Sequence, residues 1–222
     1  MTFKRVRDKI NLGKVFVTGG YRINCKGAKT SLSTVWAVLP LRVELPFLIC
    51  NYLMKEKHMK KIAIIMGSDS DLPIVEKGIN VLKEYQVPFE VHVYSAHRTP
   101  QQTADFVKSA RRKGFGAIIA AAGMAAHLAG AVAANTTLPV IGIPISCKNT
   151  GGVDALWSTV QMPTGIPVAT VAIDGAANAA ILAIEMLAIT DRVLAKRLYD
   201  SRKSGEQKVL DKNKAIEEQY NA

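Results

Sequence analysis

Cysteine is scarce in this sequence, which has three thiols, Cys25, Cys50 and Cys147, among 222 residues. So few cysteines exclude a small domain that depends on a disulfide framework. The sequence also contains no CxxC pair, and no cysteine and histidine stand at the spacing of a zinc ligand set. We therefore predict no structural zinc site.

Two common phosphate-binding signatures are missing as well. Neither a P-loop nor a GxGxxG segment occurs, and these loops hold nucleoside triphosphates and dinucleotides through their backbone N–H groups. Their absence argues against both nucleoside triphosphates and dinucleotide cofactors as ligands.

Acidic residues are few in the first part of the chain, and this imbalance produces most of the formal net charge of +11. Residues 1–60 carry 12 Lys and Arg against 3 Asp and Glu, whereas residues 61–222 carry 17 against 15. The basic surface of a nucleic-acid-binding fold is therefore not a property of the whole chain. We predict no nucleic-acid partner. The alternative is binding through the basic extension, which deletion of that extension would abolish.

Long uncharged apolar runs are also absent. The most apolar segment, Val35–Leu53, contains Arg42, Glu44 and two prolines, whereas a transmembrane helix needs about 20 predominantly apolar residues. Each charge would cost roughly 2.5–3.5 kcal/mol near the centre of a membrane helix. The run also begins too late for a signal peptide. We therefore predict neither a membrane span nor a membrane partner.

The first 58 residues differ in composition from the rest of the chain. We interpret residues 1–58 as a basic N-terminal extension and residues 59–222 as a single domain. Met54 and Met59 stand just before a strand-like segment. We favour the interpretation that translation begins at one of them, so that the upstream residues are a misplaced start or are disordered. A targeting or interaction arm is the alternative.

From residue 61 onward, short apolar segments alternate with segments of helical periodicity. Strands that are apolar on both faces and alternate with helices indicate a parallel sheet covered on both sides. Right-handed crossovers then predict an α/β fold, a three-layer doubly wound sandwich of flavodoxin-like type with a C-terminal helix. The predicted strands are 61–66, 89–94, 117–122, 139–143 and 167–173, and the predicted helices are 72–85, 100–113, 123–134, 176–188 and 191–203.

Doubly wound folds bind ligands beyond the carboxyl ends of their strands, so the loops after the first three strands are candidate sites. The first loop, GSDSD at residues 67–71, joins a strand to a helix start, where hydroxyls and backbone N–H groups favour an anion and carboxylates accept from sugar hydroxyls. We therefore consider Ser68, Ser70 and Asp71 as a phosphoribosyl cradle. Ser and Asp are also preferred helix N-caps, and this capping role is the alternative.

The second and third loops each contain a histidine. In SAHRTP at residues 95–100, His97 can exchange a proton near neutral pH and Arg98 can bind a phosphate with two donors. An ordinary surface pair is the alternative for these two residues. In GMAAHL at residues 123–128, His127 either lines the same crevice or is satisfied by backbone at a helix start.

In this order and spacing, the three loops resemble the class I N5-carboxyaminoimidazole ribonucleotide mutases of purine synthesis. The similarity covers about residues 60–212 and includes two further strings, PVIGIP at residues 139–144 and SxVQMPxGIPVATVAI at residues 158–173. Any one string is modest evidence, but five in order are specific. Residues 1–58 have no counterpart in the family.

The resemblance implies a reaction and a site. The family moves a carboxylate from exocyclic nitrogen N5 to ring carbon C4 of an aminoimidazole ribonucleotide, without metal, ATP or organic cofactor. It does so by decarboxylation and recarboxylation in a closed pocket. The resemblance implies that His97 is the general acid and base, that Ser68 and Asp71 contact the ribose phosphate part, and that Arg98 contacts the phosphate. Further implied substrate contacts are Ser70, Ser95 and His127.

The resemblance also implies a cytoplasmic homo-octamer in which the C-terminal helix reaches across subunits. Two positions depart from the family pattern, since Met124 stands where many members have glycine and Ala129 where many have proline. These changes bear on the shape of the pocket that must retain carbon dioxide and leave the reaction class unaffected.

Two alternatives share the predicted fold. One is the class II aminoimidazole ribonucleotide carboxylase, which uses free carbon dioxide and typically has SSSD and SAHK-type strings in place of GSDSD and SAHRTP. The other is a non-catalytic flavodoxin-like binding or receiver module, because a fold alone does not specify a function. A receiver would need an aspartate at the end of the third strand, where this sequence has Ala-Ala-Ala-Gly.

Overall fold

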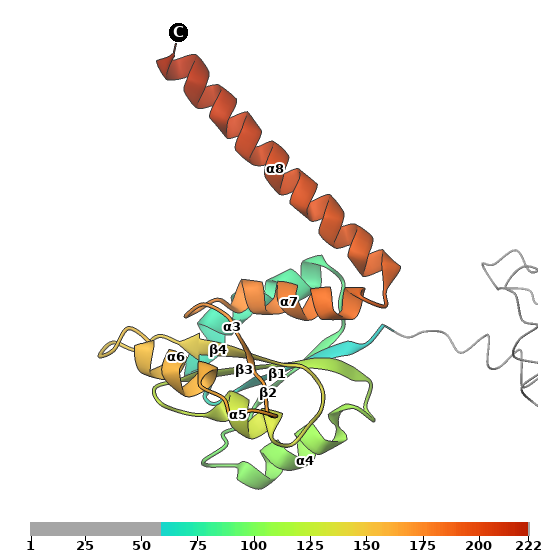
Figure 1. Cartoon of the computed structure of the whole chain (residues 1–222), viewed down its shortest axis with the longest axis vertical. Coiled ribbons are helices and arrows are strands. Elements are labelled where there is room, and N and C mark those ends of the chain that lie inside the picture. The colour runs from blue at the N-terminus through green and yellow to red at the C-terminus, as the bar shows by residue number, and fades with distance from the viewer. Residues whose placement is uncertain (1–58, 222) are drawn as a thin grey trace, which may run out of the picture. The chain divides into compact units, whose positions relative to one another are not determined.

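The computed structural model describes residues 59–221 (Figure 1). The predictions for residues 1–58, including the absence of a membrane span at Val35–Leu53, lie outside the described residues. Between residues 59 and 221, no helix combines the length and the apolar character needed to cross a bilayer.

The centre of the fold is a five-stranded sheet in which every pair of neighbouring strands is parallel. Its order is β2-β1-β3-β4-β5, which is the flavodoxin-like order of a doubly wound sheet. The predicted fold class is therefore confirmed. The strands are β1 (Lys61–Met66), β2 (Phe89–Val93), β3 (Phe115–Gly123), β4 (Val140–Ile145) and β5 (Ala169–Thr170).

Helices cover both faces of this sheet, as Figure 1 shows. One core contains the alternate residues Ile62, Ile64 and Ile119, and the other contains Ala63 and Ile118. The period of two follows from the pleat, which points successive side chains to opposite faces. The first face carries α3 (Leu72–Glu84), α7 (Ala176–Ala188) and the start of α8 (Arg192–Tyr220), and the second carries α4 (Pro100–Ala110), α5 (Leu128–Ala133) and α6 (Val153–Val160).

Helices α3 and α7 pack closely against each other at Gly78. A Cβ atom built on Gly78 would lie 2.7 Å from the backbone oxygen of Ala176. The residues Ala179, Ala180 and Ala183 on α7 are buried. Small residues on both helices are what bring the two backbones together.

Three predicted elements differ from the structure, and one helix in it was not predicted. The helix expected from residue 123 begins at Leu128, and residues 124–127 form a loop. The strand expected over 167–173 is reduced to Ala169–Thr170, which pairs with β4 alone at the edge of the sheet. Helix α6 was not predicted, and the final helix ends at Tyr220 instead of residue 203.

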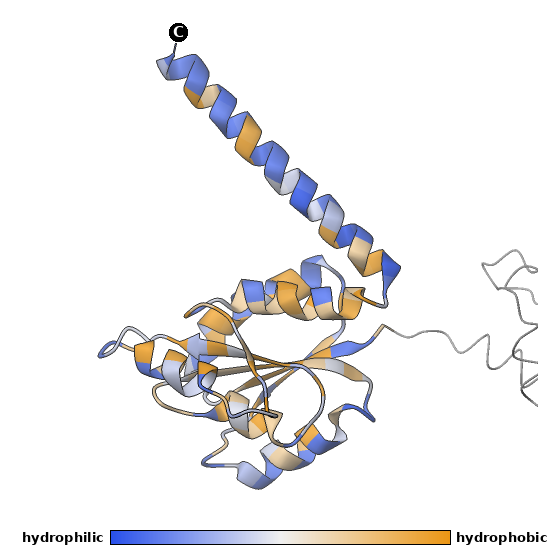
Figure 2. Ribbon diagram, viewed as in Figure 1, coloured by the Kyte–Doolittle hydropathy of each residue, from blue (hydrophilic) through white to orange (hydrophobic). Residues whose placement is uncertain are grey.

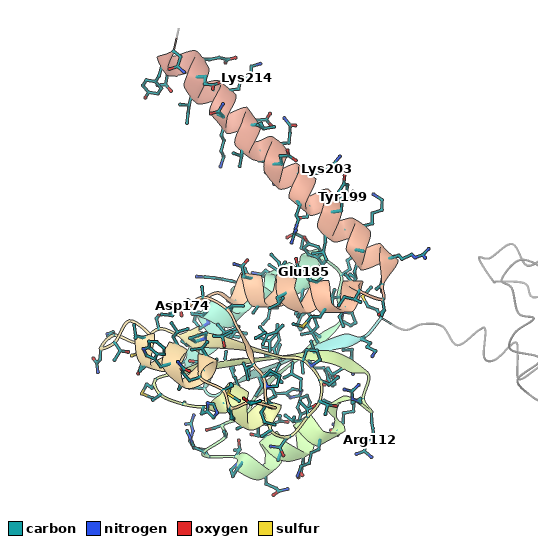
Figure 3. The ribbon with its side chains drawn as sticks, viewed as in Figure 1. Arg112, Asp174, Glu185, Tyr199, Lys203 and Lys214 are labelled. Carbon is teal, nitrogen blue, oxygen red and sulfur yellow. The ribbon has the colours of Figure 1, made fainter. Side chains whose placement is uncertain are left out.

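The first turns of α8 pack on the domain, and Arg202 farther along pairs with Glu185 of α7 at 2.5 Å. Leu194 is fully buried, and Arg197 donates hydrogen bonds to the Tyr85 backbone oxygen at 2.5 Å and to Gln86 Oε1 at 2.8 Å. Farther along, residues 199–221 are all exposed. Figure 2 shows this part of α8 as largely hydrophilic with isolated hydrophobic turns, and in Figure 3 Tyr199, Lys203 and Lys214 project from it.

Candidate active site

The loops after β1, β2 and β3 meet at the carboxyl edge of the sheet. There the chain passes from β1 to β2 on one side and then returns to β3 on the other side of β1. Ligands of doubly wound folds bind at such a switch point. A cavity of about 450 Å³ opens there. It is lined by Gly67, Ser68, Ser70, Asp71, Ser95, Ala96, His97, Arg98, Ala122, Gly123, Met124, Ala126 and Leu128.

In the loop after β1, Ser68 both caps a helix and lies at the cavity. Its backbone is extended and its Oγ accepts a hydrogen bond from the Ser70 N–H at 3.3 Å, which caps a short 3-10 helix at Asp69–Asp71. The same side chain lines the cavity. Asp71 stands at the N-cap position of α3 but makes no side-chain capping bond, so its carboxyl group is not committed to the helix.

The carboxyl group of Asp71 is shielded from water, with 7% of the residue exposed. Burial raises its pKa above the ordinary value of 3.8, since removal from water disfavours the charged form. Hydrogen bonds from the Ser68 backbone and the Ser70 hydroxyl act in the opposite direction without cancelling the effect. The cavity therefore contains a carboxyl group that retains its proton more strongly than a surface aspartate.

The loop after β2 is a tight turn held by its own residues. The Thr99 N–H and hydroxyl both donate to the Ser95 backbone oxygen, at 2.8 and 3.1 Å, and the Ser95 N–H donates to Thr99 Oγ1 at 2.9 Å. Arg98 ties this turn to the first loop, because its Nη2 donates to the Gly67 backbone oxygen at 2.8 Å. The guanidinium is thus held at the cavity with other donors left over.

His97 lies at the tip of this turn and lines the cavity. The residue is exposed, and its ring makes no hydrogen bond to any of the described residues 59–221. A general acid or base must exchange its proton with a bound molecule. An imidazole at a cavity wall, without a protein partner in the described part of the chain, is available for that exchange.

His127 is placed differently from the other predicted site residues. It does not line the cavity, and its Nδ1 is hydrogen-bonded to the backbone oxygen of Ser158 in α6. The ring lies against Gly130, where a Cβ atom would come within 1.8 Å of Nε2. Of the two roles considered, the structure shows the histidine satisfied by backbone, at the residue that precedes α5.

The loop after β3 contributes mostly small apolar groups to the wall. Ala122, Gly123 and Ala126 line the cavity together with Ala96 from the second loop and Leu128 from α5. Ala96 and Ala122 were not singled out from the sequence, since alanine carries no chemical signal. Their positions beside His97 and at the end of a predicted strand were the available clues.

The donor set of the cavity suits an oxyanion ligand with hydroxyl groups. Three serine hydroxyls and one guanidinium face a wall of alanine, glycine and leucine. Within residues 59–221, no three His, Cys, Asp or Glu side chains come together as metal ligands. The acid–base groups that the cavity offers are His97 and Asp71.

A second hollow, of about 940 Å³, lies at the opposite edge of the sheet. Lys108 in the last turn of α4 and Arg111 and Arg112 just after that helix line it, together with residues near the starts of β4 and β5. Arg111 donates to the backbone oxygen and hydroxyl of Thr137, at 3.0 and 2.9 Å. No histidine or carboxylate lines this hollow, so it offers no general acid or base of the kind found at the carboxyl edge.

Cys147, in the loop between β4 and α6, also lies outside the cavity. Hydrogen bonds from the Thr150 hydroxyl and from backbone N–H groups of Thr150 and Asn149 lower the pKa of its thiol. The thiol is 2.9 Å from Thr150 Oγ1, which itself lies 2.5 Å from Asp154. This local network lies at the start of α6, and none of its residues lines the cavity.

Comparison with known proteins relates this geometry to one group. Residues 61–208 match the family model described as AIR carboxylase. A protein of Methanocaldococcus jannaschii named N5-carboxyaminoimidazole ribonucleotide mutase is 52% identical over 159 residues, which are 72% of this chain and 99% of the relative. The mutase of the same name from Pyrococcus horikoshii is 50% identical over 157 residues, covering 71% of this chain and 89% of the relative.

Solved structures agree with the sequence comparison. The crystal structure of Treponema denticola PurE superposes with a TM-score of 0.64 at 26% identity, covering 70% of this chain and 98% of that one. The matched part therefore accounts for nearly the whole of the solved protein.

Proposed function

Because the chain belongs to the AIR carboxylase family, we propose that it is an enzyme that converts N5-carboxyaminoimidazole ribonucleotide into 4-carboxy-5-aminoimidazole ribonucleotide in purine biosynthesis. Relatives of about 50% identity carry the name of this mutase. The observation that carries the proposal is the position of His97. Its ring is free of hydrogen bonds to described residues and lines a cavity with an arginine, three serines and an apolar wall.

The polar side of the cavity binds the ribose phosphate in this proposal. Arg98 directs a guanidinium at the phosphate, which it can engage with two parallel hydrogen bonds. Ser68, Ser70 and Ser95 supply hydroxyl donors to phosphate and sugar oxygens. Asp71, shielded from water, accepts from a ribose hydroxyl when ionised.

His97 acts twice in the reaction. The bond between N5 and the carboxylate carbon breaks, its electron pair stays on nitrogen, and His97 donates a proton to that nitrogen as carbon dioxide leaves. Carbon C4 then attacks the carbon dioxide through the electron pair of the ring enamine, and the new carbon–carbon bond forms. His97 finally removes the proton from C4, which restores the aromatic ring and returns the histidine to its starting state. The sum is an isomerisation that consumes nothing.

The apolar side of the cavity retains the carbon dioxide between the two halves of the reaction. Small groups such as Ala96, Ala122 and Ala126 leave room for a linear triatomic molecule and offer it no nucleophile. Closure of a site against water is a recognised way to prevent loss of a reactive intermediate.

The test is a direct ultraviolet assay of the full chain and its His97→Asn variant. N5-carboxyaminoimidazole ribonucleotide is supplied without bicarbonate, and aminoimidazole ribonucleotide is supplied with bicarbonate in a separate reaction. We expect wild type to convert the first substrate at low enzyme concentration and the variant to lose roughly 10²–10⁴-fold in rate, the usual contribution of a positioned acid–base group. Asparagine keeps the size and polarity of the ring side chain but cannot transfer the proton.

Two other outcomes would replace the proposal. Activity with aminoimidazole ribonucleotide and bicarbonate alone would identify a class II carboxylase. No conversion of either substrate by wild type would leave a binding module of the same fold.

The assembly, the domain boundary and the compartment belong to the same proposal. We propose that residues 59–222 suffice for activity, so that a chain beginning at Met59 has the same activity as the full chain.

The exposed apolar side chains of α8, among them Val209 and Ile216, favour a homo-octamer in which α8 contacts neighbouring subunits, as the family resemblance implies. A small phosphorylated substrate of purine synthesis is consistent with a cytoplasmic location.

A further inference from the structure

Met124 holds a backbone conformation that its residue type disfavours. Its φ is +54°, in the left-handed region, and among residues 59–221 it shares a positive φ with only two other non-glycine residues, Gln86 and Asp174. A Cβ atom makes this region unfavourable for an L-residue. Strain of this kind persists where the surrounding structure imposes it, and it concentrates at functional sites.

The side chain of Met124 gains no burial in exchange for this strain. The residue is 66% exposed and lines the cavity. Its neighbours Gly123, Ala125 and Ala126 are small, so Met124 provides the one long side chain between the end of β3 and His127. By contrast, the other two strained residues are held by hydrogen bonds, with Gln86 accepting from Arg197 and Asp174 from the Ser146 N–H.

We propose that the Met124 side chain covers the bound ribonucleotide and keeps released carbon dioxide inside the cavity. This role rests on the proposed function, in which the carbon dioxide either bonds to C4 or escapes and leaves aminoimidazole ribonucleotide behind. Methionine suits such a cover because it is unbranched, apolar and able to follow an irregular surface. The strained backbone directs this side chain at the cavity, where a glycine would leave an opening.

The proposal is tested with three variants of the full chain. Met124→Ala removes the cover and keeps the Cβ that causes the strain, Met124→Gly removes both, and Met124→Leu keeps an apolar side chain of similar size. Single-turnover reactions with N5-carboxyaminoimidazole ribonucleotide, labelled with carbon-13 in its carboxylate, are run in unlabelled bicarbonate. The readouts are the fraction of substrate that ends as aminoimidazole ribonucleotide and the carbon-13 content of the product.

We expect Met124→Ala and Met124→Gly to raise the escaping fraction by the same factor, roughly fivefold, and Met124→Leu to restore it close to the wild-type value. The melting temperature separates the loss of the covering side chain from the relief of backbone strain. Only Met124→Gly relieves the strain, so only this variant should raise the melting temperature. Ile189→Ala, which truncates an 83% exposed side chain outside the cavity, is the matched control and should change neither readout.

Three results would overturn the proposal. An escaping fraction that is the same in wild type, Met124→Ala and Met124→Gly would show that the side chain retains nothing. An escaping fraction that rises only in variants whose oligomeric mass is also lower would instead assign Met124 to a subunit contact. A wild-type chain that leaves the substrate unconverted would remove the proposed function itself and this role with it, a result distinct from the other two.

Discussion

Asp71 is the residue at which folding and function make opposite demands. The fold removes its carboxyl group from water and raises its pKa, while the proposed site uses it as a hydrogen-bond partner of the sugar. Below the ordinary value of 3.8, the group is protonated in the folded and the unfolded chain and does not affect stability. As pH rises through the interval up to the folded pKa, the unfolded chain loses its proton first, so folding becomes less favourable.

We therefore expect Asp71→Asn to raise the melting temperature more at pH 7 than at pH 3, because the amide carries no charge to desolvate. Because variant and wild type are compared at the same pH, the contributions of the other titrating groups to stability cancel. At neutral pH the same variant should bind substrate more weakly, which steady-state kinetics would show as a higher KM. Equal changes in melting temperature at the two pH values would contradict the role of burial.

The two histidines show what can be predicted at this scale. Both lie in loops that follow predicted strands, and the sequence alone allowed either to line the site. His97 lies at the tip of a turn closed by Ser95 and Thr99, whereas His127 is drawn away by the backbone of Ser158, 31 residues farther along the chain. A partner at that separation, on a helix that was not predicted, cannot be inferred from the loop itself.

At the scale of elements, Gly78 decides how α3 packs on α7. Helix propensity alone predicts that Gly78→Ala stabilises the protein by about 1 kcal/mol. The new Cβ, however, would lie 2.7 Å from a backbone oxygen, and backbone cannot move aside as the end of a side chain can. We expect the packing effect to dominate, with a net destabilisation of about 1–3 kcal/mol.

Urea unfolding of Gly78→Ala beside Gly205→Ala would check this expectation. Gly205 lies in α8, where a Cβ would meet nothing within 4 Å, so the alanine there should express the propensity gain of roughly 0.5–1 kcal/mol. A stabilised Gly78→Ala variant would mean that the helices separate easily.

The elements that were predicted correctly are those with a strong local pattern. Strands β1, β3 and β4 are short apolar segments bounded by glycine or proline, and parallel pairing brings their carboxyl ends, and hence the site loops, to one edge. Helix α6 escaped prediction because it spans only Val153–Val160 and starts after two glycines with positive φ. The far part of α8 escaped prediction because apolar residues are few among residues 204–220, where Val209, Leu210, Ile216 and Tyr220 are separated by polar side chains.

At the scale of the whole molecule, most of α8 extends beyond the domain, so that the domain does not bury its apolar side chains. Val209, Ile216 and Tyr220 are 66%, 58% and 73% exposed, and an isolated helix gains little stability in water without tertiary packing. Its exposed turns are therefore the surface on which the proposed octamer depends.

We expect the double variant Val209→Asp, Ile216→Asp to reduce the assembly to smaller species, because each charge would have to be buried at a subunit contact. Light scattering coupled to size-exclusion chromatography gives the mass, and Glu206→Gln, an exposed substitution on the same helix, serves as the control. A double variant with the mass of an octameric wild type would place the subunit contacts elsewhere. A monomeric wild type would refute the octamer.

The hydrogen bond from Arg197 to Tyr85 can form only late in translation. Its ends are 112 residues apart, and at a ribosomal rate of about 5–20 residues per second roughly 6–20 s pass between the appearance of the two partners. Throughout that interval the turn between α3 and β2 lacks the hydrogen bonds that Arg197 donates to it, and the apolar surface that Leu194 covers in the folded protein is exposed to water. The nascent domain is therefore most open to chaperones and proteases until its last helix emerges.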